Sequence, residues 1–413
     1  MFYLCVALLF TLSPWTVKAD QCPICLAYFH GRSVAPVVVK TQCCGQRFDL
    51  DCISKCFVDQ PIGSRRCAMC RQDPMPVVNQ NTSESHPDTF FPDHTFYRAC
   101  LNEDLDQVER SLAEGVNVNA VMTYDFTALM LASIDGHMKV VERLIGAGAD
   151  VNAARTEDGA TPLFIAAQEN NTDCMKALIE AKADLNARAK DGSTPLHIAA
   201  ANGNTASIKL LINAGADINI QTEAGVSPLF IAAQENSTDC LKALIEAKAD
   251  LNAPTEDGAN PLYIAVQENN TECVKLLINA GADLNARAKD GATPLLIAAQ
   301  ENNTESMKLL INAGANLNTR TKDGTTALFI AALKGNTDSV EILINAGADL
   351  NSRYKDGATP LFAAALKGNT DCVQLLIIVG ADVNAALPNG ATPLSIATEM
   401  GNTDCVEALT GAE

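Results

Sequence analysis

The chain has 413 residues, 47% of them hydrophobic, and a formal net charge of −19 at neutral pH. The apolar fraction is ample for a folded core. The negative charge argues against a nucleic acid as partner, because a phosphate backbone is bound by a basic surface. Charge and cysteine are both uneven: residues 22–70 hold six cationic side chains against three carboxylates, and eight of the fifteen cysteines. The composition therefore predicts a small cysteine-rich domain on a long acidic body.

Residues 1–19 form an apolar segment that resembles the core of a secretory signal. Val17 and Ala19 are small enough to precede a cleavage site after Ala19. The segment lacks a positively charged start, is short for a membrane span and contains Pro14. We therefore interpret it as a possible signal peptide, with an apolar anchor or a wrongly assigned start as open alternatives.

The cysteine-rich segment contains two C-x2-C pairs that bracket four further cysteines. The eight are Cys22, Cys25, Cys43, Cys44, Cys52, Cys56, Cys67 and Cys70. Each C-x2-C pair can direct two thiolates at one tetrahedral ion. A domain of about 50 residues buries little apolar surface, so a bound metal would supply its folding free energy. We expect residues 20–71 to form a zinc-binding domain.

Three stretches make this domain resemble the RING fingers of ubiquitin ligases: CPIC at 22–25, CCGQRFDLDCI at 43–53 and CAMCR at 67–71. The resemblance implies two Zn²⁺ ions in a cross-braced pattern. By position, it places the first ion on Cys22, Cys25, Asp49 and Cys52, and the second on Cys44, Gln46, Cys67 and Cys70. It also implies that Ile24 and Arg71 contact a ubiquitin-conjugating enzyme, and that Arg71 contacts the ubiquitin carried by that enzyme.

Cys56 and Ala68 stand where the RING family has tryptophan and proline, which weakens the conjugating-enzyme surface that the resemblance implies. Two metal-ligand positions also depart from the RING pattern. Gln46 stands where the family has histidine, and Asp49 where it has cysteine or histidine. An amide rarely ligates zinc, whereas Cys43 and Cys56 are spare thiols that restore two complete four-ligand sets. We expect one or both spare cysteines to ligate, and the alternative is a degenerate second site with weak affinity for zinc.

A disulfide-bonded domain is the rival interpretation of the same cysteines. An even number of cysteines after a possible signal peptide is typical of a secreted framework. Against it, a C-x2-C pair would close only a tiny loop, and the order of the whole motif is that of a RING finger.

Residues 72–91 are rich in proline, asparagine and serine and show no hydrophobic period. This composition predicts a flexible tether between the zinc-binding domain and the rest of the chain. Such a tether would let the domain swing, as a ligase that presents different lysines requires.

From residue 92 to residue 413 the sequence repeats every 33 residues, in about ten units. Most units open with D-G-x-T-P-L-x-I-A-A and close with A-G-A-D-L-N, and residues 191–200 read DGSTPLHIAA. This period and motif are typical of ankyrin repeats, which the segment resembles. The resemblance implies a mainly α fold, an ankyrin-repeat solenoid of helix pairs with β-hairpin tips that binds other proteins, preceded by the small RING-like zinc-binding domain.

Helix boundaries can be placed within a unit. Thr161 and Thr194 are expected at helix N-caps, followed by Pro162 and Pro195, where a missing N–H costs nothing. The corner between the two helices needs a left-handed backbone, which glycine or asparagine provides. The corner residues are Gly203, Gly335, Gly368, Gly401, Asn170, Asn236, Asn269 and Asn302. His197 is expected to be a hydrogen-bonding core residue.

Five cysteines recur at one position of the second helix: Cys174, Cys240, Cys273, Cys372 and Cys405. Stacked helices lie about 8–10 Å apart, whereas a disulfide needs Cα atoms nearer than about 7 Å. We therefore expect free thiols, which favour a reducing compartment. A signal peptide favours export, so the localisation stays open. Export followed by action inside another cell's cytosol would reconcile the two.

An arginine recurs at the tips and predicts a basic ridge that contacts a protein partner. Its residues are Arg188, Arg287, Arg320 and Arg353, with Tyr354 beside them. Aromatic residues are expected on the inner helix face, namely Phe164, Phe230, Tyr263, Phe329 and Phe362. The alternative is a solvated surface, since the tips are so alike that they carry little specificity.

These features favour a RING-type E3 ubiquitin ligase whose array binds a protein substrate and whose zinc-binding domain binds a conjugating enzyme. The alternative is a non-enzymatic scaffold. No Ser/His/Asp or phosphate-loop pattern is visible in the sequence. We therefore expect no covalent catalytic residue, no small-molecule substrate and no nucleic acid.

Overall fold

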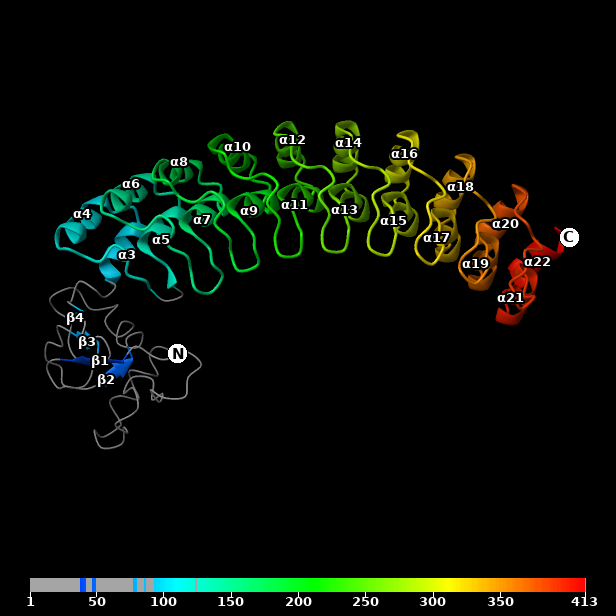
Figure 1. Ribbon diagram of the computed structural model, residues 1–413, viewed down its shortest axis with the longest axis horizontal. Coiled ribbons are helices and arrows are strands. Elements are labelled where there is room, and N and C mark those ends of the chain that lie inside the picture. The colour runs from blue at the N-terminus through cyan, green and yellow to red at the C-terminus, as the bar shows by residue number, and fades with distance from the viewer. Residues whose placement is uncertain are drawn as a thin grey trace. The chain divides into compact units, whose positions relative to one another are not determined.

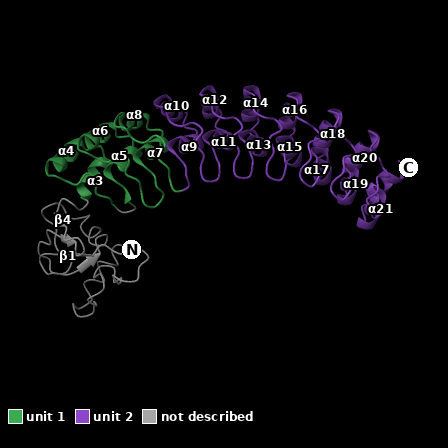
Figure 2. Cartoon of the chain, in the orientation of Figure 1, with its two compact units in different colours: residues 1–190 green, residues 191–413 purple. Residues whose placement is uncertain are grey.

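The computed structural model describes residues 93–122 and 125–412, and the backbone of four short strands nearer the N-terminus. The chain divides into two compact units, residues 1–190 and 191–413 (Figure 2). No helix among the described residues is long and apolar enough to cross a membrane. The predicted signal segment 1–19 lies outside the described residues, as does most of the predicted zinc-binding domain.

The four strands of unit 1 form one antiparallel sheet in the order β2-β1-β3-β4. They are β1 (Val38–Thr41), β2 (Arg47–Asp49), β3 (Val77–Asn79) and β4 (Ser85–His86). Strands β3 and β4 lie inside the segment 72–91, for which we expected a tether without regular structure. Val77 and Val78 are β-branched and favour an extended backbone, and they pair with Thr41 and Lys40 of β1.

Helix pairs and the loops that join them make up residues 93–122 and 125–412 (Figure 1). In unit 1 the first helices of the pairs are α3 (His94–Leu101), α5 (Ala128–Ile134) and α7 (Pro162–Gln168), and the second helices are α4 (Leu105–Ala113), α6 (Met138–Gly146) and α8 (Thr172–Glu180). The mainly helical solenoid expected from the repeats is thereby confirmed.

In unit 2 the first helices form one row and the second helices another, with loops extending from the first row (Figure 1). The first helices are α9 (Pro195–Ala201), α11 (Pro228–Gln234), α13 (Pro261–Gln267), α15 (Pro294–Gln300), α17 (Ala327–Lys334), α19 (Pro360–Lys367) and α21 (Pro393–Met400). The second helices are α10 (Thr205–Ala214), α12 (Thr238–Glu246), α14 (Thr271–Ala280), α16 (Thr304–Asn312), α18 (Thr337–Asn345), α20 (Thr370–Ile378) and α22 (Thr403–Thr410).

The loops that join successive pairs, which we call the tips, are turns rather than the expected β-hairpins. In the tip between α12 and α13, the amide of Thr255 donates to the carbonyl of Ala259 over 2.9 Å, and the amide of Gly258 donates to that of Thr255 over 2.8 Å. These two hydrogen bonds close a turn but are too few to form the paired strands of a β-hairpin. Residues 93–122 and 125–412 accordingly contain no strand.

The predicted helix signals are confirmed. Thr161 caps α7 by accepting a hydrogen bond from the amide of Phe164 over 3.3 Å, with Pro162 at the first helical position. Thr194 is the N-cap residue of α9, with Pro195 at the first helical position. All eight predicted corner residues have a positive φ, from 54° at Asn236 to 79° at Gly335. Left-handed geometry at the corner lets each second helix fold back along the first.

His197 is a core residue, as expected, with 1% of its surface exposed. Its Nδ1 lies 2.8 Å from the hydroxyl of Thr194, and its Nε2 lies 3.1 Å from the carbonyl oxygen of Val226. The side chain therefore links the start of α9 to the next tip of unit 2.

A recurring asparagine at the N-cap of the second helix joins most helix pairs to the preceding pair, whereas α12 has Ser237 at this position. The Nδ2 of Asn336 donates to the carbonyls of Ala299 and Gln300, at the end of α15, over 2.8 and 2.9 Å. The equivalent residues are Asn171 in unit 1 and Asn270, Asn303, Asn369 and Asn402 in unit 2. We call these the staple asparagines. Each donates to one or two carbonyls in the last turn of the preceding first helix, where the helix itself supplies no amide.

The cysteines of the repeats are free and buried, as predicted. The structure describes six of them, Cys100, Cys174, Cys240, Cys273, Cys372 and Cys405. Burial raises the pKa of the Cys174 and Cys273 thiols to about 11. Cys273 also donates to the Oδ1 of the corner residue Asn236 over 3.5 Å, and Ser339 donates to that of Asn302 over 2.7 Å. The thiols thus serve as small packing residues that also contact a neighbouring corner.

Removal of a staple should destabilise the stack locally. In Asn336→Ala, two carbonyls at the end of α15 lose their donors, so we expect a loss of about 1–3 kcal/mol in the free energy of unfolding. Urea unfolding measures this loss, and hydrogen exchange should place it in α15 and α18. Asn345→Ala, at the exposed end of α18, is the matched control and should stay within about 0.5 kcal/mol. Equal effects of the two substitutions would contradict the role of the staple.

The buried thiols should resist alkylation in the native chain. Only the thiolate reacts, and a pKa of about 11 leaves little thiolate at about pH 8. We expect iodoacetamide, followed by peptide mapping, to leave Cys174 and Cys273 unmodified until urea is added. Rapid native alkylation of Cys174 or Cys273 would show that these sites open in solution.

Candidate partner-binding groove

Two positions of each repeat in unit 2 meet on the face between the tips and the first helices, and the residues there decide whether this face is filled or open. One is the third residue of a first helix, such as Phe230 in α11. The other is the first residue of the tip turn that follows the pair, such as Thr255, which we call the tip residue. We call the whole face the groove.

At α17 and α19 the groove is filled by the protein itself. The ring of the tip residue Tyr354 stacks on Phe329 with centroids 5.2 Å apart and an angle of 11° between the planes. Its hydroxyl donates to Asp323 over 2.9 Å. Phe362 belongs to the same apolar cluster, against which the next tip residue, Leu387, is packed. The predicted aromatic inner face is therefore present here, but it is covered.

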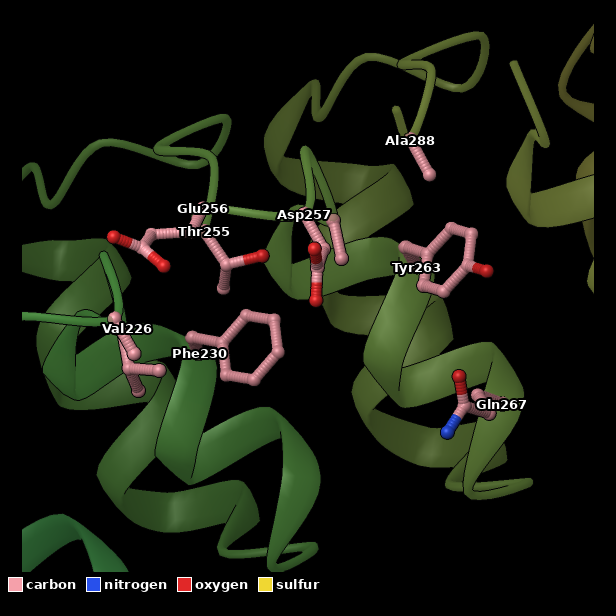
Figure 3. A pocket seen from close by; sticks show the side chains of 10 residues that line it. Val226, Phe230, Thr255, Glu256, Asp257, Tyr263, Gln267 and Ala288 are labelled. Carbon is pink, nitrogen blue, oxygen red and sulfur yellow. The ribbon is translucent and has the colours of Figure 1, made fainter. Parts of the chain in front are cut away.

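At α11 and α13 the tip residues are small and the groove is open. A cavity of about 370 Å³, which we call the Phe230 pocket, is lined by Ala224, Val226, Phe230, Thr255, Glu256, Asp257, Ala259, Tyr263, Gln267 and Ala288. Figure 3 shows the rings of Phe230 and Tyr263 on adjacent first helices, with the Asp257 carboxylate on the tip between them. Thr255 and Ala288 occupy the place that Tyr354 fills farther along.

A second cavity of about 530 Å³ adjoins the first and shares Tyr263 and Gln267 with it. This Tyr263 pocket is lined by Tyr263, Gln267, Glu268, Asp290, Ile297, Gln300 and Glu301. Partial burial raises the pKa of the Tyr263 hydroxyl, and the nearby carboxylates of Asp290 and Glu301 raise it further. A raised phenol pKa with these causes indicates a negative potential in the pocket.

The two pockets are acidic. Their described lining includes the carboxylates of Glu256, Asp257, Glu268, Asp290 and Glu301, and no lysine or arginine. Asp257 pairs with Lys289 over 3.9 Å, but both side chains are largely exposed, so this ion pair contributes little. Gln267 and Gln300 donate to Glu268 and Glu301 over 3.3 and 2.9 Å. These amides orient the carboxylates without neutralising them.

The predicted arginine ridge has a structural role in unit 2. The guanidinium of Arg287 donates to the carbonyl of Arg320, and that of Arg320 donates to the carbonyl of Arg353. Arg353 donates to the carbonyls of Gly357 and Ala386 over 3.0 and 3.2 Å. Each guanidinium thus ties one tip to the next, which gives a reason for its recurrence.

Partner binding by these arginines stays a prediction. Arg188 lies exposed in unit 1, and Tyr354 faces Phe329 and Asp323 in unit 2. The pockets were not predicted as such, although the small residues Thr255 and Ala288, set against Tyr354 at the equivalent position, were a visible signal.

The predicted zinc ligands and conjugating-enzyme contacts cannot be placed. Asp49 lies in strand β2, of which only the backbone is described. The others lie outside the described residues, namely Ile24, Arg71, Cys22, Cys25, Cys43, Cys44, Cys52, Cys56, Cys67 and Cys70. Within the part of the chain that the structure describes, no group of three or more His, Cys, Asp or Glu could hold a metal ion.

Comparison with known proteins supports the repeat architecture. A family model for ankyrin repeats, in three copies, matches residues 96–189, 142–222, 196–288, 285–354 and 347–413. No curated protein matches the chain by sequence. Because the family matches together span most of the chain, from residue 96 to residue 413, this protein belongs to the ankyrin-repeat family.

Proposed function

We propose that this protein binds a segment of another protein in the groove of unit 2. The observation that carries the proposal is the pair of adjoining pockets, in which Phe230 and Tyr263 lie beside carboxylates without a strong cationic partner. Concave sites with aromatic walls and a few convergent polar groups are favoured places for binding. The stack holds these residues on helices, so the groove is organised before a partner arrives.

A finer proposal concerns the N-terminal domain, which we propose is a RING-type ubiquitin ligase module. The support is the sequence: six cysteines at RING ligand positions and two spare cysteines, Cys43 and Cys56, and thiolates are ligands that suit zinc. In this proposal the domain holds two Zn²⁺ ions and uses Ile24 and Arg71 to bind a charged conjugating enzyme. In this proposal the ankyrin repeats bind the protein substrate. The alternative is a scaffold in which zinc only folds the domain.

Selection of displayed random peptides against the full chain tests groove binding. We expect related sequences to be enriched, and Tyr263→Ala to weaken their binding by about tenfold or more, as removal of a central aromatic contact does. Tyr354→Ala is the matched control, because it removes a ring from the filled part of the groove and should leave affinity unchanged. Sensitivity to Arg320→Ala or Tyr354→Ala in place of Tyr263→Ala would move the interface to the arginine ridge. If none of these three substitutions changes the affinity, the groove is not the binding site.

Native mass spectrometry of the full chain tests the ligase proposal. We expect two bound zinc ions that a chelator removes, and ubiquitin chain formation that Ile24→Ala abolishes while zinc stays bound. Val34→Ala, outside the three RING-like stretches, is a matched apolar control and should keep the activity. Zinc binding without activity toward any conjugating enzyme would favour the scaffold. A chain without zinc whose cysteines are paired would favour the disulfide-bonded domain.

A further inference from the structure

The first unit contains an arginine that already occupies the position of a tip residue. The guanidinium carbon of Arg155 lies 4.2 Å from the centroid of the Phe126 ring. The same guanidinium pairs with Glu157 over 3.2 Å and with Asp158 over 3.5 Å. Its side chain is only 17% exposed. An aromatic ring and two tip carboxylates therefore suffice in this protein to hold a guanidinium group.

Thr255 is the equivalent residue at the Phe230 pocket. Its amide donates to Ala259 across the tip over 2.9 Å, as the amide of Arg155 donates to Ala160 over 3.0 Å. Arg155 is followed by Thr156-Glu157-Asp158-Gly159, whereas Thr255 is followed directly by Glu256-Asp257-Gly258. The turn in unit 1 is therefore one residue longer, but both turns carry a Glu-Asp pair before the glycine. The pocket thus presents a Glu-Asp pair and an aromatic ring, with a short side chain where unit 1 has arginine. The ring differs in origin: Phe230 is the third residue of α11, whereas Phe126 precedes the N-cap of α5.

The Tyr263 pocket shares part of this arrangement one pair farther along. The tip residue of that pair is Ala288, which lines the Phe230 pocket, and Asp290 of the same tip lines the Tyr263 pocket. Lys289 stands between them, where the preceding tip has Glu256. Two more carboxylates, Glu268 and Glu301, come from the ends of α13 and α15. The half-buried ring of Tyr263 supplies an aromatic surface between the two pockets.

We propose that the partner segment carries two arginines three residues apart in an extended conformation, with one guanidinium in each pocket. This proposal rests on the proposed function and names its partner. Neighbouring helices of a stack lie about 8–10 Å apart. Three residues of an extended or polyproline-II chain span about 9–10 Å, and the latter has three residues per turn, which places both side chains on one side. Arginine fits better than lysine, because its planar group stacks on rings and binds carboxylates with two bonds.

The net charge of −19 attracts any cationic peptide, so the test must separate the pockets from this general attraction. The probe is a fluorescein-labelled peptide with the core Arg-Ala-Pro-Arg between Gly-Ser flanks, titrated with the full chain by fluorescence polarisation at about 0.15 M salt. Matched peptides carry lysines, adjacent arginines, or arginines five residues apart. We expect the core peptide to bind tightest, by about three- to tenfold over each of the others.

Two variants address the pockets with matched controls. Asp290→Asn with Glu301→Gln removes charge from the Tyr263 pocket, and should weaken binding of the core peptide by about tenfold. Asp239→Asn with Glu272→Gln makes the same change on the second helices α12 and α14 and should have a much smaller effect.

Thr255→Arg should place a guanidinium of the protein itself in the Phe230 pocket and lower the affinity for the core peptide by about tenfold. Asn279→Arg, exposed on α14, is its control.

Equal affinity for every spacing, or equal effects of the pocket and control variants, would overturn this inference and leave only general charge attraction. The same holds if no arginine peptide binds. Failure of this inference can be told apart from failure of the proposed function. If the selected peptides lack arginine but their binding depends on Tyr263, the groove remains the binding site and only the proposed arginine partner is wrong. If their binding does not depend on Tyr263, both the groove and the arginine partner are wrong.

Discussion

The hydrogen bonds of the staple asparagines are the constraint on which the repeat stack depends. A short first helix of seven or eight residues ends with carbonyls that no amide within the helix can reach. Without an amide from the next pair, carbonyls such as those of Ala299 and Gln300 would lose their side-chain donors. Asn336, Asn369 and their equivalents bring an amide from the next pair to these carbonyls. One side chain therefore satisfies a helix end and fixes the spacing of two helix pairs, so that apolar faces built largely from alanine and leucine meet in register.

A second set of hydrogen bonds, between successive tips, allows the side chain at the tip-residue position to differ from repeat to repeat. The guanidinium groups of Arg287, Arg320 and Arg353 hold successive tips together through backbone carbonyls, so the tips do not depend on what the tip residue is. That position can therefore carry a side chain that closes the groove, such as Tyr354, or one that leaves it open, such as Ala288. Binding properties then vary along the array at little cost to stability, which is a consequence of contacts made only between neighbouring repeats.

Periodicity made much of the fold predictable from the sequence. Residues whose role is local, such as the N-cap Thr161 and the corner residues Asn236 and Gly335, have the same neighbours in every repeat and could be placed from the 33-residue period alone. The pockets could not be placed from the period, because they depend on which side chain of a first helix meets which side chain of the following tip. The arginine ridge shows the same limit: charge and recurrence suggested a binding surface, whereas the guanidinium groups reach the next tip's carbonyls. Strand β3 was missed because its pairing with β1 joins segments far apart in the sequence.

The distribution of carboxylates decides what kind of recognition the groove supports. Acidic side chains occur over the whole array, so overall charge speeds the approach of cationic partners but does not choose between them. Selection requires carboxylates that are fixed beside an apolar surface, where a partner cation is partly removed from water and its geometry matters. Asp290 and Glu301 beside Tyr263 meet this condition, whereas Asp239 on the exposed side of α12 pairs only with Lys242 of its own helix. Since Arg155 satisfies the same condition within the chain, recognition by the groove follows from the spacing of its pockets rather than from the charge of the array.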